Sequence, residues 1–498
     1  MKIHLMFSKQ NWLVQHLSPA MLACLLTALI SGWLLFLPQI HGLADNGDFY
    51  RAMLSNGVYR LPLHYRQYLN YVVPKFGLLQ YYNENNVAVF SSQTLFVKTA
   101  VFLNRLFYSK TIFDLRFLAG VYFIPYLFAI YFLTRSLVYP YRNLKSYLIA
   151  LLIVFVFADS SFTLYFNSFF AEPGMLIAML FAFAAIMSLV RHCDVKSWPM
   201  VTVFFLSTII LITNKQQNAP LALSFLVVAA GLLFMPKKHH RTLLLAVGMM
   251  AVLASGVVTY RMINQEFNDV NQYQAFTHGV LMETPDPSRQ IEKGGINEQF
   301  ALMRAQDYYP KNFASVKPSQ KVVRKRLIAK YNYAWLVRYY AGHLHQFSAL
   351  LDVAAKDLMI TQVKAVGDYT KLSGARPGQQ FTYFTLFSSV MGAFFPKRFV
   401  FLILLAVVFI GVYAVSAYLD FKAGRYEAIM RFLLVLGLMT IVIFVPIISI
   451  IGDGDADLAK HLFMVPVSLD LLFLLLISDA LTHRLWTTHL KAGASNET

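Results

Sequence analysis

About ten blocks of apolar residues, most of them close to twenty residues long, constrain this chain more than any other feature. A block of that length can cross the roughly 30 Å hydrocarbon core of a bilayer as one α-helix. A transmembrane barrel would instead require short segments of alternating polarity. Charged residues make up only 14% of the 498 residues, against about a quarter in an ordinary soluble domain. The sequence therefore predicts an all-α polytopic membrane protein with about ten transmembrane helices.

The first apolar block raises the question of a cleaved signal peptide. Gly42-Leu43-Ala44 has the small residues of a cleavage site, but the apolar run from Pro19 to Pro38 is longer than the 7–15 residues of a signal core. We therefore expect an uncleaved anchor. The predicted spans are 19–38, 113–135, 146–158, 174–190, 200–213, 219–235, 242–260, 398–419, 429–451 and 462–481.

Basic residues in the short connections orient these spans. If the N-terminus is cytoplasmic, every connection on that side carries Lys or Arg, as the positive-inside rule requires. The net charge of +18 then reflects membrane orientation and does not indicate nucleic-acid binding. We expect a bacterial inner-membrane protein with both termini in the cytoplasm. The orienting residues are Lys2, Lys9, Arg135, Arg142, Lys145, Arg191, Lys196, Lys237, Lys238, Arg241, Lys422, Arg425, Arg431, Arg484 and Lys491.

The spans divide the chain into three predicted regions. Residues 1–260 form a membrane domain with seven spans and a first external loop at 39–112. Residues 261–397 form an external, partly helical region, and residues 398–498 contain three more spans. Loops of this length are usually functional or structured.

We expect amphipathic helices along the outer surface in both long loops. In the first loop, the stretch from Tyr65 to Phe76 is aromatic and amphipathic. In the second loop, the segment from Ser319 to Asp357 has apolar residues near helical spacing, which predicts a helix. The residues with this spacing are Val323, Leu327, Tyr331, Leu336 and Tyr340.

In this topology the unusual polar motifs all fall on the outer side. Four separate connections place carboxylates, amides and cations at one membrane surface, and this convergence predicts a functional site. The motifs are Asp45-Asn46-Gly47-Asp48, Asn167 through Glu172-Pro173, Asn214-Lys215-Gln216-Gln217-Asn218, and Gly452 through Asp457 followed by Lys460 and His461.

The first motif pairs two carboxylates. In a helix Asp45 and Asp48 would share one face, and one acid can raise the pKa of the other. Such a carboxylate can act as a general base on a hydroxyl. The alternative is a turn with a helix cap, because Asp-Asn-Gly-Asp is also turn chemistry.

The second and third motifs combine helix starts with charges. Pro173 suits the opening of the span from 174, and Asn218 before Pro220 suggests a cap for the next span. Glu172 needs a partner, because a carboxylate at the lipid boundary is costly. Lys215, a compact cation on the same side, is a candidate phosphate ligand.

The fourth motif resembles a loop that binds a hard metal. Asp453, Asp455 and Asp457 alternate, although the glycine and glutamate of an EF-hand are missing. These three carboxylates are candidate metal ligands. Lys460 and His461 could handle a phosphate leaving group directly or through Mg²⁺, but an ordinary ion pair and a helix cap explain the same residues.

Three motifs together resemble those of membrane-embedded glycosyltransferases of the GT-C class, in particular bacterial hexose transferases that decorate surface-layer glycans. They are Gly42 through Arg51, Phe166 through Pro173, and Gly452 through Asp457 with Lys460 and His461. The resemblance implies a GT-C-like fold and a polyprenyl-phosphate-linked sugar donor. The acceptor would be a glycan or lipid-linked molecule, and the residues agree with this chemistry.

The resemblance implies roles for the polar residues on the outer side. Asp48 is the preferred base, with Asp45 as the alternative, in an inverting displacement. Lys460, His461, Lys215 and Arg51 would hold the donor phosphate, and Mg²⁺ or Mn²⁺ is a candidate cofactor. Supporting or acceptor-binding roles fall to Asn167, Glu172, Gln217 and Asn218. A flippase or transporter is the alternative, although such proteins place polar residues near mid-bilayer; a membrane scaffold is a third possibility.

Overall fold

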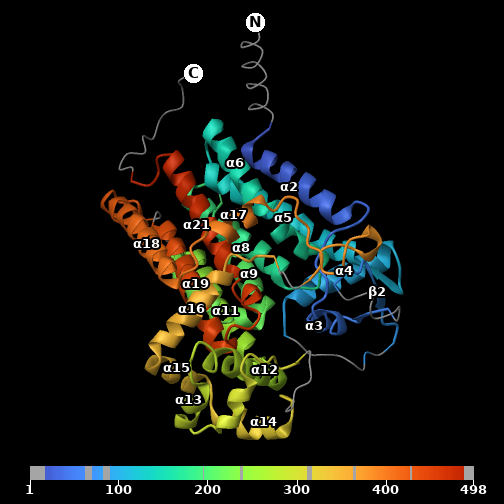
Figure 1. The fold of residues 1–498 in the computed structure, drawn as a ribbon. Helices are drawn as coiled ribbons and strands as arrows, with labels where there is room; N and C mark the ends of the chain where they lie inside the picture. The colour runs from blue at the N-terminus through green and yellow to red at the C-terminus, as the bar shows by residue number, and fades with distance from the viewer. Residues whose placement is uncertain are drawn as a thin grey trace, which may run out of the picture.

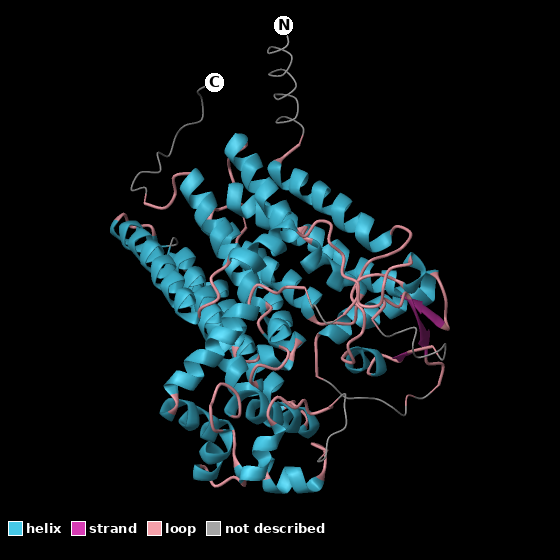
Figure 2. Ribbon diagram, viewed as in Figure 1, coloured by secondary structure: helices cyan, strands magenta, loops and turns pink. Residues whose placement is uncertain are grey.

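Apolar helices form a long bundle, and two groups of shorter elements pack against one end of it (Figures 1 and 2). The computed structural model describes residues 17–61, 70–81, 83, 90–194, 196–235, 239–310, 317–362, 366–426 and 429–486. Part of the aromatic stretch of the first loop, residues 65–69, lies outside these ranges. So do five of the orienting residues, namely Lys2, Lys9, Lys237, Lys238 and Lys491.

Each predicted span corresponds to a helix. Among the described residues, seven helices are long and apolar enough to cross a bilayer, or eight if α6 and the segment after it form one bent span. The seven are α2 (Pro19–Phe36), α5 (Leu115–Val138), α8 (Glu172–Val190), α11 (His239–Arg261), α18 (Phe399–Lys422), α19 (Ile429–Asp453) and α21 (Met464–Leu481). The prediction of an all-α polytopic membrane protein is confirmed.

The other three predicted spans are shorter or bent. Helix α6 (Leu144–Phe157) bends by 54° into Ser160–Asn167, which comprises α7 (Ser160–Thr163) and η2 (Leu164–Asn167). Helices α9 (Trp198–Asn214) and α10 (Leu221–Gly231), the latter continued by η4 (Leu232–Phe234), have fewer than 18 residues. At about 1.5 Å per residue, neither helix fills a full hydrocarbon core.

Helix α8 lies at the centre of the bundle. About 89% of its apolar window is buried inside the protein, against 33% for α11 and for α18, which lie at the rim. It packs against α5, α9, α19 and α21. Small residues on α8, among them Gly174, Ala178 and Ala182, allow the neighbouring helices to approach closely.

The first long loop contains a small sheet as well as helices. Helix α3 (Phe49–Leu54) is followed by an antiparallel sheet in the order β1 (Val58–Tyr59), β2 (Lys75–Leu78) and β3 (Ile112–Asp114), with α4 (Gln93–Phe107) between the last two strands. The expectation of a helical stretch reaching Phe76 is therefore wrong at its end. Gly77 is required there, because a Cβ atom would lie 2.2 Å from the ring of Tyr59. The amphipathic helix of this loop is α4.

The second long segment is mostly helical but in short pieces. They are α12 (Gln265–Ala275), the π-helical turn η5 (Phe276–Val280), α13 (Pro287–Lys293), η6 (Glu298–Met303), α14 (Lys321–Arg326), η7 (Ile328–Lys330), α15 (Tyr333–Gly342), α16 (Leu344–Asp357), η8 (Lys371–Ser373) and α17 (Leu386–Phe394). The predicted helix over 319–357 is thus divided, because Asn332 accepts a bond from Trp335 N and starts a new helix. The five residues predicted to face inward there are all buried.

Candidate functional site

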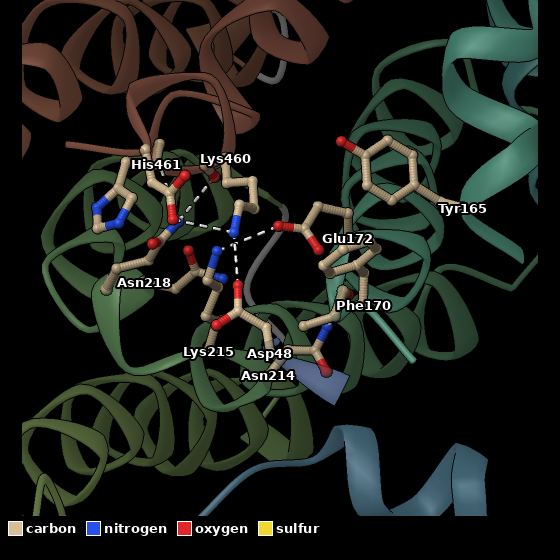
Figure 3. A network of polar contacts seen from close by, with 12 residues as sticks. Asp48, Tyr165, Phe170, Glu172, Asn214, Lys215, Asn218, Lys460 and His461 are labelled. Carbon is tan, nitrogen blue, oxygen red and sulfur yellow. Dashed lines mark hydrogen bonds and ion pairs between the residues drawn. The ribbon is translucent and has the colours of Figure 1, made fainter. Parts of the chain in front are cut away.

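Four stretches that are far apart in the sequence meet at one end of the bundle (Figure 3). Asp48 precedes α3, Glu172 opens α8, and Lys215 follows α9 just before η3 (Gln216–Asn218). Lys460 and His461 belong to α20 (Leu458–His461), a short helix between α19 and α21. The predicted convergence of the polar motifs is present in the structure.

A buried lysine forms the centre of this site. The Lys460 Nζ atom lies 2.5 Å from Asp48 Oδ2 and 3.1 Å from Asp457 Oδ2, while its side chain is only 6% exposed. It also lies 5.7 Å from the centroid of the Phe170 ring. Asp48 is 32% exposed, so one carboxylate face of the pair remains open to a ligand.

The charges fix the protonation states of this pair. Burial alone would raise the pKa of Asp48, but the ammonium of Lys460 and the guanidinium of Arg51 outweigh burial and hold that pKa well below its usual range. Burial tends to lower the pKa of Lys460, but Asp48 and Asp457 raise it above the ordinary value. The pair is therefore a carboxylate and an ammonium.

The turn that presents Lys460 depends on two left-handed residues. Gly454 has φ +66°, and a Cβ atom there would lie 2.3 Å from the backbone of His278. Asp457 has φ +47° and directly precedes α20. These two residues reverse the chain after α19, so that α20 faces Asp48 and does not continue the span.

A second ion pair lies beside the first. Lys215 Nζ is 3.1 Å from Glu172 Oε1; Glu172 is 1% exposed and Lys215 is 23% exposed. Asn214 Nδ2 donates to the Ala171 carbonyl at 2.7 Å and joins the end of α9 to the start of α8. The predicted need of Glu172 for a partner is thus met by Lys215, and Pro173 lies at the start of α8 as expected.

His461 is held as a neutral imidazole. Its Nε2 atom lies 3.3 Å from Asp453 Oδ2. Burial, together with repulsion by Lys215 and Lys460, lowers the pKa of His461 to about 3 against the opposing effect of Asp457. Asp453 is 5% exposed, and its Oδ1 atom is buried without a hydrogen-bond partner among the described residues.

A cavity of about 550 Å³ adjoins His461 and Asp453. It lies among α10, α11, α12, α15 and α19, and its lining is partly polar and partly apolar. The polar lining includes Gln217, Arg261, Asn268 and Asn271, and the apolar lining includes Leu221, Ile263, Val337, Val445, Ile448 and Met464. Its size and mixed lining are typical of a small-molecule site.

Asp45 and Arg51 flank Asp48 in different ways. The Asp45 Oδ1 atom accepts bonds from Gly47 N at 2.7 Å and Phe49 N at 3.2 Å, and its other oxygen pairs with Arg60. Asp45 thus has the turn chemistry that the sequence left open. Arg51 lies 3.6 Å from Asp48 and 4.3 Å from the centroid of the Phe267 ring.

Three of the predicted amides bond to backbone. Gln217 Nε2 donates to the carbonyls of Lys460 at 3.2 Å and His461 at 3.4 Å, which positions α20. Asn167 is fully buried and donates to the carbonyls of Leu35 and His41. Asn218 donates to the Leu211 carbonyl at 2.8 Å, so it binds the end of α9 and makes no side-chain cap for α10.

The three alternating aspartates do not form one ligand set. Asp453 faces His461, Asp457 faces Lys460, and Asp455 lies 2.7 Å from His278 Nδ1. Among the described residues no group of three or more His, Cys, Asp or Glu side chains is arranged to hold a metal ion. The expectation that these carboxylates together bind Mg²⁺ or Mn²⁺ therefore does not fit the geometry, because each faces a different side chain.

Sequence reasoning missed the contribution of the second long segment. Asn268 and Asn271 on α12 line the cavity, and His278 in η5 joins Asp455 to Asp307, whose Oδ1 atom is 3.2 Å from the His278 Nε2. The spacing of the two asparagines, i and i+3, was a usable signal, because it places them on one helix face.

Comparison with known proteins identifies the family of this chain. Among curated proteins none matches the chain. Among solved structures, the oligosaccharyltransferase of Archaeoglobus fulgidus in its apo form is similar, with a TM-score of 0.37 and 14% sequence identity over 92% of this chain and 50% of that protein. The chain thus corresponds to about half the length of that enzyme. The sequence profile of a membrane family matches residues 6–497, and the chain therefore belongs to the family described as the YfdI N-terminal transmembrane domain.

Proposed function

We propose that this protein is a membrane glycosyltransferase. It moves a sugar, most simply a hexose, from a polyprenyl-phosphate-linked donor to a glycan or lipid-linked acceptor at the outer face of the bacterial inner membrane. The observation that carries the proposal is one open carboxylate, Asp48, bonded to a buried ammonium, Lys460, beside a partly apolar cavity.

The cavity suits the lipid end of such a donor. Most of its apolar side chains come from α10, α19 and the start of α21, which are apolar helices that a polyprenyl chain would also contact, and Val337 comes from α15. Its polar rim, with Gln217 and His461, is next to the two lysines. A lipid phosphate at this rim would face Lys215 and Lys460 while its chain occupied the apolar part.

The lysines suit the donor phosphate. Lys215 is 23% exposed, and it directly precedes Gln216 and Gln217, which line the cavity. Preorganised cations lower the barrier when negative charge develops on a leaving group. His461, neutral in this environment, can donate or accept one hydrogen bond without adding charge.

Asp48 suits the role of base. In the proposed step its carboxylate takes the proton of the acceptor hydroxyl, and the acceptor oxygen bonds to the anomeric carbon. The bond from that carbon to the phosphate oxygen breaks, and the lipid phosphate departs with the electron pair. A base whose pKa is held low is a weak base, so a donor phosphate that draws Lys460 away from Asp48 would strengthen it at the moment of reaction.

The test is transfer of labelled sugar by purified protein in lipid. The wild-type protein should glycosylate an added acceptor from a polyprenyl-phosphate-linked sugar, and Asp48→Asn should abolish transfer without loss of folded protein. Glu298→Gln, which removes an exposed carboxylate from the second long segment, is the matched control and should keep full activity. A folded wild-type protein that moves intact donor lipid across the bilayer and transfers no sugar would be a flippase. Full transfer by Asp48→Asn would refute the base assignment alone.

A further inference from the structure

A cluster of arginines lies at the end of the bundle opposite Asp48. Helices α8, α19 and α21 each have one end at the site, through Glu172, Asp453 and the residues after His461. At their other ends lie Arg191, Arg431 and Arg484, each about one helix length away from the site. We call these three residues, with Asp420 and Asp479, the distal arginine cluster.

The cluster is held together by buried carboxylates. Asp479 is fully buried and pairs with Arg191 and, at 2.9 Å, with Arg431. Arg431 also lies 3.5 Å from Asp420, which binds Arg425 at 2.7 Å. These contacts join α8, α18, α19 and α21, and a role in holding the helices together accounts for them.

That structural role does not account for all of the positive charge. Within the described part of the chain no carboxylate pairs with Arg484: its Nη2 donates to the Tyr139 carbonyl at 2.7 Å, and its guanidinium lies 4.8 Å from the centroid of the Tyr141 ring. Its Nη1 atom is buried without a hydrogen-bond partner among the described residues. The Nε atom of Arg191 is in the same situation, and the Arg191 side chain is only 8% exposed.

Buried guanidinium nitrogens without an acceptor favour an added anion. A buried donor without an acceptor is unfavourable, because its hydrogen bond to water is lost and not replaced. Burial, together with the nearby guanidiniums of Arg484 and Arg431, lowers the pKa of Arg191 to about 10 despite the ion pair with Asp479. The cluster therefore has more positive charge than its own carboxylates neutralise, and a phosphate would satisfy planar guanidinium donors well.

The position of the cluster indicates the source of the phosphate. It lies where apolar spans end, and Lys145 at the start of α6 donates to the Leu481 carbonyl at the same end. Three exposed aromatic residues, Tyr139, Tyr426 and Trp486, lie in the segments at this end, and such residues are enriched at the head-group level of membranes. We propose that the distal arginine cluster binds the head-group phosphate of an anionic phospholipid, a site independent of the proposed glycosyl transfer.

The full-length protein in lipid nanodiscs provides the test. In mixed nanodiscs, phosphatidylglycerol should be retained by the wild-type protein in preference to phosphatidylcholine, as measured by native mass spectrometry, and should raise the Tm. Arg484→Gln should weaken the preference about fivefold, because a basic residue near a charged lipid contributes about 1 kcal/mol. Arg142→Gln removes an exposed arginine at the same end and should change it little.

Three results would overturn the proposal. The first is equal retention of the two lipids by the wild-type protein, a comparison that stands even if Arg484→Gln does not fold. The second is an equal loss of preference in Arg142→Gln and Arg484→Gln, which would indicate general surface charge. The third is equal stabilisation by inorganic phosphate in phosphatidylcholine nanodiscs, which would assign the site to a soluble anion. None of these results depends on sugar transfer.

Discussion

Replacing Lys460 by Gln tests the proposed mechanism in two independent ways. The substitution removes an ammonium that is 6% exposed and 2.5 Å from Asp48, while the amide keeps most of the volume. The protein should remain folded, because Asp48 is one-third exposed and keeps Arg51 at 3.6 Å. We expect the free energy of unfolding to fall by about 1–3 kcal/mol, less than the roughly 3–5 kcal/mol lost when a fully buried pair is broken.

The rate of sugar transfer should fall even though the protein stays folded. A hydrogen bond to a charged group contributes about 1.5–3 kcal/mol. If Lys460 makes that bond to the departing phosphate, its loss lowers kcat by about 10- to 150-fold, since 1.36 kcal/mol is one factor of ten. Lys397→Gln, an exposed lysine outside the site, should keep the wild-type rate.

The pH dependence gives the second test. Asp48 must be ionised to act as base, so activity falls as the pH drops through its pKa. Lys460 and Arg51 hold that pKa well below the usual range against the effect of burial. In Lys460→Gln the acid limb of kcat/KM, which reports the free enzyme, should therefore move to higher pH. A variant with the wild-type rate, or with an unmoved acid limb, would refute the assignment of Asp48 and Lys460 as a coupled pair.

Three further substitutions test other parts of the site. Gly42→Ala places a Cβ atom 2.4 Å from the Asn167 carbonyl oxygen, so it should destabilise the protein by about 1–3 kcal/mol and lower transfer although no charge changes; a thermal melt equal to that of the wild type would contradict this. Asp455→Asn removes the partner that raises the pKa of His278 against burial. A raised histidine pKa stabilises the folded state below the unfolded value of about 6.5, and this stabilisation is lost as the pH rises through the folded pKa. Denaturant unfolding should therefore show a loss of about 1–3 kcal/mol at acidic pH that shrinks as the pH rises, and a pH-independent difference would exclude the ion pair. His461→Gln should leave the shape of the pH–rate profile unchanged, because the imidazole is already neutral above a pKa of about 3; a wild-type limb near pH 6.5 that disappears in this variant would show a protonated His461.

Sequence periodicity was sufficient to predict the membrane spans, but it was not sufficient to predict the structure of the loops. Apolar runs predict membrane helices because the bilayer requires their length, and Pro173 marks the start of α8 because its ring suits an opening turn. The strand Lys75–Leu78 could not be foreseen, since it exists only through pairing with Ile112–Asp114. Strand propensity depends on such partners.

The composition of the site was more predictable than its contacts. Topology placed Asp48 and Lys460 on one side of the membrane, but the bond between them joins residues 412 positions apart. The metal hypothesis stays a prediction, although the three aspartates that suggested it face different side chains. Gly454 and Asp457 adopt left-handed conformations, and these send the three aspartates of the loop toward different partners, which an alternating sequence does not reveal.

A structure of the protein with a bound polyprenyl phosphate would show whether the donor binds at the Asp48–Lys460 pair. The phosphate should lie within hydrogen-bonding distance of Lys215 and Lys460, with the lipid chain in the cavity beside His461 and an open path from Asp48 to the phosphate. A lipid phosphate bound elsewhere, with the Asp48–Lys460 pair unchanged and the cavity unfilled, would contradict this prediction.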